Sequence, residues 1–279
     1  MSDGMDVRHA IEARGPADGP ALVLLHGTRR TRAMWRHQLE GLADAYRVVA
    51  VDLPGHGALA DVPFRLGDAV AHVSRVIDAA AGGRAIVVGQ SLGAYVGMDL
   101  AATRPHQVAG LVLASATIEP RSIARRAPRA VGSYLLASAT ERVRGGSPDP
   151  AADRGGGGGD RSNGGDGRAG ADPATSGWLF KGGARAMVAA LREAFTPRLA
   201  AYPGPTLIVN GEEDGLFRRG ERAFLAAAAD GRLVVIPGCG HLVNEHAPEV
   251  FNAAVRWFAA EVHGLDAPAG PSPVRRAGA

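Results

Sequence analysis

Short apolar runs recur along the chain and alternate with stretches of helical periodicity. Several runs are continuously apolar, as in strands that are covered on both faces. The stretches between them supply the helices that parallel strands need as crossovers. The pattern therefore predicts an α/β fold with a mostly parallel central sheet and helices on both faces. The predicted strands are residues 21–25, 47–51, 85–88, 108–113, 206–209 and 233–236, and the predicted helices are 31–43, 66–81, 92–103, 221–229 and 248–262.

The alternation of strand and helix stops between residues 118 and 202. We therefore expect a core built from residues 1–117 and 203–263, with residues 118–202 inserted as a helical cap. The last stretch, residues 264–279, is rich in Pro, Gly and Ala, and we expect it to be a flexible tail.

The middle of the predicted cap has an unusual composition. Residues 144–177 contain no large aliphatic or aromatic side chain and are rich in glycine. Such a segment cannot bury enough apolar surface to offset the entropy of ordering it, so we expect it to be disordered. Helix-compatible stretches at residues 123–139 and 178–195 flank it.

Composition excludes several classes of protein. Hydrophobic residues make up 46% of the chain and charged residues 21%, as in globular proteins. The apolar runs are far shorter than the roughly 18 residues that cross a bilayer, and the N-terminus has no apolar signal segment. We therefore expect a cytoplasmic protein without a membrane partner.

The formal net charge is +3, from 31 basic and 28 acidic residues spread along the chain. So small and dispersed an excess does not predict a nucleic-acid partner. The one cysteine, Cys239, excludes an internal disulfide and any zinc site that needs two thiolates. With no strand-turn-helix context around it, Cys239 is interpreted as a small loop or core residue.

One short motif carries the clearest chemistry. The apolar run ending at Val88 leads directly into Gly89-Gln90-Ser91-Leu92-Gly93, and a helical stretch follows. Gly-x-Ser-x-Gly between a strand and a helix is typical of a nucleophile elbow, in which a tight turn exposes the serine hydroxyl. Ser91 is therefore the candidate nucleophile.

A serine hydroxyl needs a general base, and the base needs an acid to orient it. His241 follows the predicted strand 233–236 through a glycine-containing loop, and Asp214 follows the strand 206–209. Both positions lie at the carboxyl edge of the sheet, where open α/β sheets place their sites. Three other carboxylates remain candidates for the acid, namely Glu212, Glu213 and Glu119.

Several blocks together resemble the α/β-hydrolase superfamily, in its branch with a serine nucleophile. They lie in the family's order at residues 24–28, 52–57, 89–93, 210–214 and 240–248. The resemblance implies a catalytic triad of Ser91, Asp214 and His241, with the backbone N–H groups of Thr28 and Leu92 as the oxyanion hole. It also implies structural roles for His26 and Asp52.

The resemblance implies a hydrolase that acts on an ester-like or activated acyl bond of a small molecule, with no metal and no organic cofactor. Serine rather than aspartate at position 91 argues against the family's epoxide hydrolases and haloalkane dehalogenases. Two alternatives remain. One is cleavage of a carbon–carbon bond, or a lyase step, on a small carboxylated metabolite, and the other is a ligand receptor without catalysis.

Arg29 and Arg30 follow Thr28 directly, and Arg32 lies close behind. At the start of a predicted helix, cations oppose the helix dipole, so helix stability does not explain their placement. They are either ordinary surface charges or groups that bind a carboxylate or phosphate of the substrate. The sequence leaves the substrate and the oligomeric state open.

Overall fold

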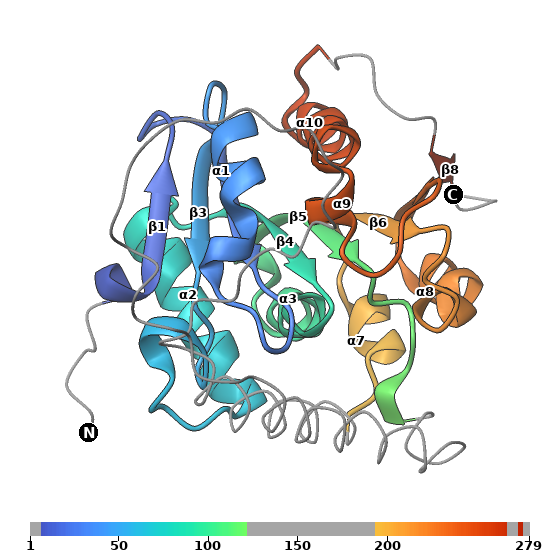
Figure 1. Cartoon of the computed structure of the whole chain (residues 1–279), viewed down its shortest axis with the longest axis horizontal. Coiled ribbons are helices and arrows are strands. Elements are labelled where there is room, and N and C mark those ends of the chain that lie inside the picture. The colour runs from blue at the N-terminus through green and yellow to red at the C-terminus, as the bar shows by residue number, and fades with distance from the viewer. Residues whose placement is uncertain (1–6, 122–192, 267–272, 276–279) are drawn as a thin grey trace, which may run out of the picture.

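The computed structural model describes residues 7–121, 193–266 and 273–275, and within them the chain forms one eight-stranded sheet in the order β1-β3-β2-β4-β5-β6-β7-β8 (Figure 1). The six inner strands are parallel, and the edge strands β1 and β8 run antiparallel to their neighbours. The strands are β1 (Ile11–Arg14), β2 (Ala21–Leu25), β3 (Arg47–Val51), β4 (Ala85–Gln90), β5 (Val108–Ala114), β6 (Pro205–Gly211), β7 (Asp230–Ile236) and β8 (Val274–Arg275).

Helices cover both faces of the sheet. Alternate side chains of β2 show the division, since Val23 and Leu25 join the core cluster under α2, α3, α7 and α8, whereas Leu22 and Leu24 join the cluster under α1, α9 and α10. Both faces of β2 are fully buried, which explains its continuous apolar run. The helices are α1 (Arg36–Gly41), α2 (Leu66–Ala80), α3 (Leu92–Thr103), α7 (Thr196–Ala201), α8 (Glu221–Ala227), α9 (Val243–His246) and α10 (Pro248–His263).

The prediction of a mostly parallel α/β sheet is confirmed. Each of the six predicted strands is present, with ends that differ by no more than a few residues. The sheet has its switch point between β2 and β4, because the chain runs outward from β2 to β3 and then returns to the other side of β2. Ligands of open α/β sheets bind beside the carboxyl ends of the strands at such a point.

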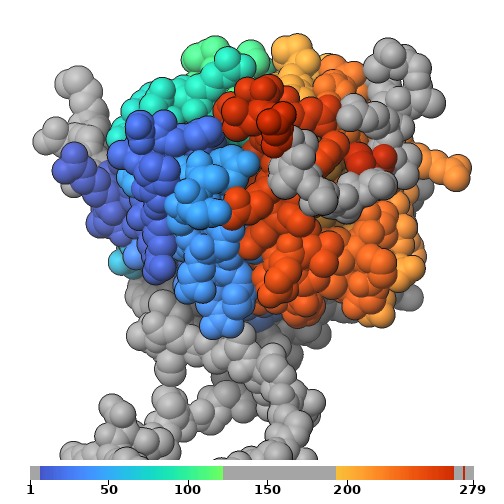
Figure 2. Space-filling view, turned by 90° about the horizontal axis from the view of Figure 1, so that it is seen from above, coloured from blue at the N-terminus to red at the C-terminus, as the bar shows by residue number. Residues whose placement is uncertain are grey.

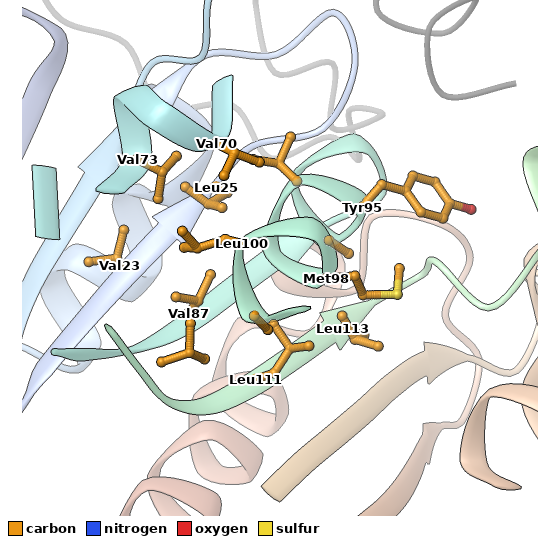
Figure 3. Close-up of a cluster of buried hydrophobic side chains, with 14 of the residues drawn as sticks. Val23, Leu25, Val70, Val73, Val87, Tyr95, Met98, Leu100, Leu111 and Leu113 are labelled. Atoms are coloured by element: carbon orange, nitrogen blue, oxygen red, sulfur yellow. The ribbon is translucent and has the colours of Figure 1, made fainter. Parts of the chain in front are cut away.

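Helix α3 is the most deeply buried helix at this switch point. Its side chains Met98 and Leu100 face the strands, near Leu113 and Val87 (Figure 3), whereas the ring of Tyr95 packs on that of Phe195. The helix is apolar nearly all round, as expected of a helix enclosed by a core rather than lying on a surface. Its position is therefore set by packing on every side.

Three details differ from the predicted elements. Residues 31–43, predicted as one helix, form a 3-10 turn at Arg32–Trp35 followed by the short α1. The Thr31 side chain accepts a hydrogen bond from the N–H of Ala33 and so caps the tighter turn. The edge strand β1 was not predicted. Within the segment expected to be a flexible tail, Val274–Arg275 form β8 on the edge of β7.

Most of the predicted cap lies outside the described residues, including residues 123–139 and the glycine-rich 144–177. Its last part is described, and there α7 packs on α3. Phe195, Leu199 and Tyr202 are buried in the same cluster as α3. The division of the chain into core, cap and tail stays a prediction.

The two ends of the described core pack against each other. Gln38 of α1 donates to the carbonyl of Asn244 and to the side chain of Asn252 in α10. Figure 2 shows the blue N-terminal and the orange-to-red C-terminal residues side by side on this face. These contacts hold α9 and α10, and with them the loop after β7, against the start of the chain. No helix in the described part of the chain is long and apolar enough to cross a bilayer.

Buried polar side chains join the loops that follow β2 and β3. The Leu53 N–H donates to Nε2 of His26 at 3.0 Å, so Nδ1 of His26 carries the proton and donates to the Gly27 carbonyl at 2.8 Å. Asp52 accepts from the backbone N–H groups of Arg32 and Ala58. His26 and Asp52 therefore hold loops together, as the family resemblance implies.

Buried histidines predict acid sensitivity. Burial lowers the pKa of His26 from 6.5 to about 4 and that of His56 to about 3, so the folded protein holds both rings neutral. In the unfolded chain these rings bind protons below about pH 6.5. Between about pH 6.5 and 4 the unfolded state therefore binds more protons than the folded state. The free energy of unfolding falls as the pH drops through this range.

Urea denaturation across this pH range measures the effect. We predict that His56→Asn loses less stability than the wild type on acidification, by roughly 2 kcal/mol at about pH 4.5. His106→Asn, at an exposed position, is the control and keeps the wild-type pH dependence. Equal pH dependence in all three proteins contradicts the prediction.

Candidate active site

Ser91 occupies a strained turn between β4 and α3. Its φ is 51° and its ψ is −111°, a conformation that non-glycine residues rarely adopt. A Cβ at Gly89 would lie 2.4 Å from the backbone nitrogen of Ala94, and one at Gly93 would lie 2.1 Å from the carbonyl oxygen of Leu25. Glycine at both positions lets α3 approach the strands and force the turn. This is the geometry of a nucleophile elbow.

His241 and Asp214 lie in contact at the same edge of the sheet. Nδ1 of His241 lies 2.7 Å from Oδ2 of Asp214. A carboxylate can only accept, so Nδ1 carries a proton, and Nε2 is the nitrogen with the lone pair in the neutral ring. The Asp214 side chain is 7% exposed and that of His241 is 35% exposed. The pair therefore combines a buried carboxylate with an imidazole that solvent can reach.

Two neighbours hold His241 in place. The ring of Phe217 packs on the imidazole, with centroids 4.2 Å apart and planes inclined by 39°. The side chain of Gln90, the residue before Ser91, donates from Nε2 to the His241 carbonyl at 3.2 Å. The elbow and the histidine loop are thus joined directly.

Sequence reasoning missed both Phe217 and Gln90. Gln90 could have been found inside the Gly-x-Ser-x-Gly motif, where its position next to the serine places it at the sheet edge. Phe217 follows Asp214 by three residues, but nothing in the local pattern marks an aromatic side chain in a turn as a histidine contact.

The other carboxylates that remained candidates have different partners. Glu119 accepts hydrogen bonds from the backbone N–H of Phe195 and from both the N–H and the hydroxyl of Thr196, at the start of α7. Glu212 accepts from the N–H of Gly238, and the Glu213 side chain is exposed. The structure therefore pairs His241 with Asp214.

Backbone donors lie beside the elbow. Leu92 is the first residue of α3, so its N–H precedes the first helical hydrogen bond and lies at the positive end of the helix dipole. Thr28 follows Gly27, where a Cβ would lie 2.0 Å from Oε1 of Gln90. Leu92 therefore follows Ser91 directly, and Thr28 follows a glycine that lies close to Gln90, the residue before Ser91.

The arginines after Thr28 have distinct surroundings. Arg29 has a φ of 65°. Arg30 forms a 3.5 Å ion pair with Glu245, four residues after His241, and is 36% exposed. Arg32 pairs with the buried Asp52 at 2.5 Å and holds the loops described above. Arg32 is therefore structural, whereas Arg30 lies beside the histidine loop.

Cys239 is buried in the core cluster under α9 and α10. Burial raises the pKa of its thiol, and the charge of Glu213 adds to the shift, so the neutral thiol is favoured. This agrees with its interpretation as a core residue. Among the residues that the structure describes, no three His, Cys, Asp or Glu side chains are grouped to hold a metal ion.

Comparisons with known proteins place this geometry in a family. A model described as the alpha/beta hydrolase family matches residues 22–254. A 2-(acetamidomethylene)succinate hydrolase of Mesorhizobium japonicum is 30% identical over 264 residues, which are 90% of this chain and 92% of that protein. A pimeloyl-acyl-carrier-protein methyl ester esterase of Nitrosomonas europaea is 39% identical over 107 residues, 38% of this chain and 40% of the esterase.

Solved structures have the same fold. A hydrolase from Pseudomonas aeruginosa PA01 superposes with a TM-score of 0.64 at 25% identity, over 91% of this chain and 94% of that one. The chain spans less than half the length of the first curated relatives that it matches, but nearly the full length of the succinate-derivative hydrolase. The family match over residues 22–254 and the relative matched over nearly its full length show that the chain belongs to the alpha/beta hydrolase family.

Proposed function

We propose that this protein is a hydrolase that cleaves an ester-like or activated acyl bond of a small molecule through a triad of Ser91, His241 and Asp214. The observation that carries the proposal is the contact between His241 and Asp214, which shares the sheet edge with the strained turn at Ser91. A buried acid that fixes the proton on Nδ1 leaves Nε2 to act as a base. A receptor on the same fold has no need of that arrangement.

In the proposed reaction, Nε2 of His241 removes the hydroxyl proton as Oγ of Ser91 attacks the acyl carbon. The N–H groups of Thr28 and Leu92 stabilise the oxyanion of the tetrahedral intermediate. The protonated imidazole then gives its proton to the leaving group, and Asp214 stabilises the imidazolium in the meantime. Water repeats the same steps on the acyl-enzyme and restores Ser91.

We further propose that the substrate carries a carboxylate near the reacting bond. The relative that matches over nearly its full length is named for a succinate derivative, a dicarboxylate. Arg29 and Arg30 follow Thr28, and the pair between Arg30 and Glu245 is long and partly exposed. Such pairs contribute little to stability, so a substrate carboxylate can replace Glu245 at low cost.

Ser91→Ala tests the nucleophile. We expect kcat for p-nitrophenyl esters to fall by about 10³- to 10⁶-fold, because the members of a triad act as a unit. Steady-state kinetics measures the loss, and circular dichroism checks that the variant is folded. Activity within tenfold of the wild type rules out Ser91 as the nucleophile.

Paired amide substitutions test the choice of acid. Asp214→Asn should lower kcat by roughly 10³- to 10⁴-fold, because an amide cannot hold His241 in the same tautomer. Glu119→Gln removes a charge that binds α7 rather than His241, and should change kcat much less. Kinetics with the same ester decides the matter, and a larger loss in Glu119→Gln means that Asp214 is the wrong acid.

A charged and a neutral ester test the carboxylate site. We predict that Arg29→Ala or Arg30→Ala raises KM for the p-nitrophenyl monoester of succinate by about tenfold and leaves KM for p-nitrophenyl butyrate nearly unchanged. Arg14→Ala is the control, since Arg14 lies on the edge strand β1 and pairs with Glu12. Equal changes for both esters, or no change for either, remove these arginines from the proposed site.

A further inference from the structure

Thr117 lies just beyond the carboxyl end of β5 and makes three hydrogen bonds there. Its hydroxyl donates to the carbonyl of Phe217 at 2.6 Å and accepts from Nδ2 of Asn210 at 2.8 Å. Its backbone carbonyl accepts from the N–H of Gly220 at 2.9 Å. Thr117 is fully buried, so these bonds are shielded from competing water.

These bonds fix the 3-10 turn η5 (Phe217–Gly220). A Cβ at Gly220 would lie 2.3 Å from the carbonyl oxygen of Thr117, so glycine is required for the turn to approach this closely. The second N–H of the Asn210 amide donates to Glu221, which follows the turn. The turn is thereby held at its start by the Thr117 hydroxyl and at its end by Gly220 and Glu221.

The turn carries the aromatic ring that contacts His241. Phe217 packs on the imidazole at 4.2 Å between centroids, while the N–H of Arg218 donates to the carbonyl of Asp214 at 3.1 Å. The same short segment therefore touches both the histidine and its acid. A shift of the turn moves the ring on which the imidazole rests.

Thr117 is itself anchored to the elements that carry the other site residues. The hydroxyl of Tyr95, in the helix that begins after Ser91, donates to the carbonyl of Ile118 at 2.9 Å. The N–H of Ser115 donates to the carbonyl of Val209 in β6 at 3.0 Å. The position of Thr117 is thus set relative to both α3 and β6.

We infer that Thr117 is a positioning residue for His241, acting through the backbone and ring of Phe217. Its hydroxyl holds the turn so that the ring keeps the imidazole aligned between Asp214 and Ser91. The inference rests on the proposed role of His241 as the general base. Misalignment of a catalytic group lowers the rate of the chemical step more than it weakens binding of the substrate.

Thr206 offers a matched control. It is a fully buried threonine in β6, next to β5, and its hydroxyl has no hydrogen-bond partner among the described residues. Thr206→Val and Thr117→Val make the same chemical change at equal burial. Only Thr117→Val breaks hydrogen bonds of the turn whose Phe217 contacts His241.

The experiment combines kinetics on p-nitrophenyl acetate with proton NMR of the His241 Nδ1–H, whose downfield signal is assigned by its loss in His241→Gln. We expect Thr117→Val to lower kcat about tenfold with KM within twofold, and to shift or broaden that signal. Thr117→Ser keeps the hydroxyl and should restore kcat to within twofold of the wild type. Thr206→Val should leave both the kinetics and the signal unchanged.

A double variant tests the route through Phe217. If Thr117 acts through the ring, Thr117→Val should lower kcat less than about threefold when introduced into Phe217→Leu. Both changes then disrupt the same contact between Phe217 and His241, so their effects do not add. A tenfold loss in both backgrounds overturns the route. Thr117→Val with wild-type kcat and an unchanged His241 signal overturns the inference itself.

The proposed triad and the positioning role of Thr117 can fail separately. If Ser91→Ala retains activity, the triad proposal fails, but the NMR signal still reports whether Thr117 positions His241 against Asp214. If Thr117→Val does not fold, Thr117→Ser and Phe217→Leu carry the test. In that case, a Phe217→Leu variant with wild-type kcat and an unchanged signal overturns the inference.

Discussion

The site depends on the close approach of α3 to the strands at the turn around Ser91. The two glycines of the turn leave no room for a side chain, since a Cβ at Gly93 would overlap the Leu25 carbonyl. Ser91 adopts a positive φ because the packing of α3 forces it, and such strain of about 1–3 kcal/mol persists only where the surrounding structure imposes it. The buried side chains around Met98 and Leu100 provide that support. A core that holds one helix rigidly is thus the condition for the strained turn that carries Ser91.

The other site residues depend on the same sheet edge, but loops carry them. His241 and Asp214 lie beyond the ends of β7 and β6, where backbone hydrogen bonding no longer follows a ladder. Their positions come from specific contacts instead, namely Gln90 with the His241 carbonyl and Phe217 with its ring. The strands determine where the site lies, and buried polar side chains such as Thr117 determine how well its parts are aligned.

The parts that sequence could predict have local signals. Continuous apolar runs indicated the buried parallel strands, and the elbow motif lies within five consecutive residues. The contact between Thr117 and Phe217 joins residues 100 positions apart, and no periodicity reports such a contact. The edge strand β1 spans only Ile11–Arg14, too short for its alternation to stand out. The packing of α7 on α3 likewise joins distant segments of the chain and arises only on folding.

The roles of the arginines near the site could not be predicted from the sequence either. Arg30 and Arg32 are alike in sequence, two positions apart, yet Arg30 pairs with the partly buried Glu245 and Arg32 with the buried Asp52. Composition alone could not separate a surface charge from a structural one. The partner, which the fold brings from a distant segment, decides the role.

Labelling with a fluorophosphonate, followed by peptide mass spectrometry, tests most directly whether Ser91 is the nucleophile. We predict one phosphonylated residue, Ser91, no adduct in Ser91→Ala, and much slower labelling in His241→Ala. Labelling of another serine, such as the buried Ser115, would contradict it. So would a wild-type protein that hydrolyses p-nitrophenyl esters while Ser91 stays unlabelled.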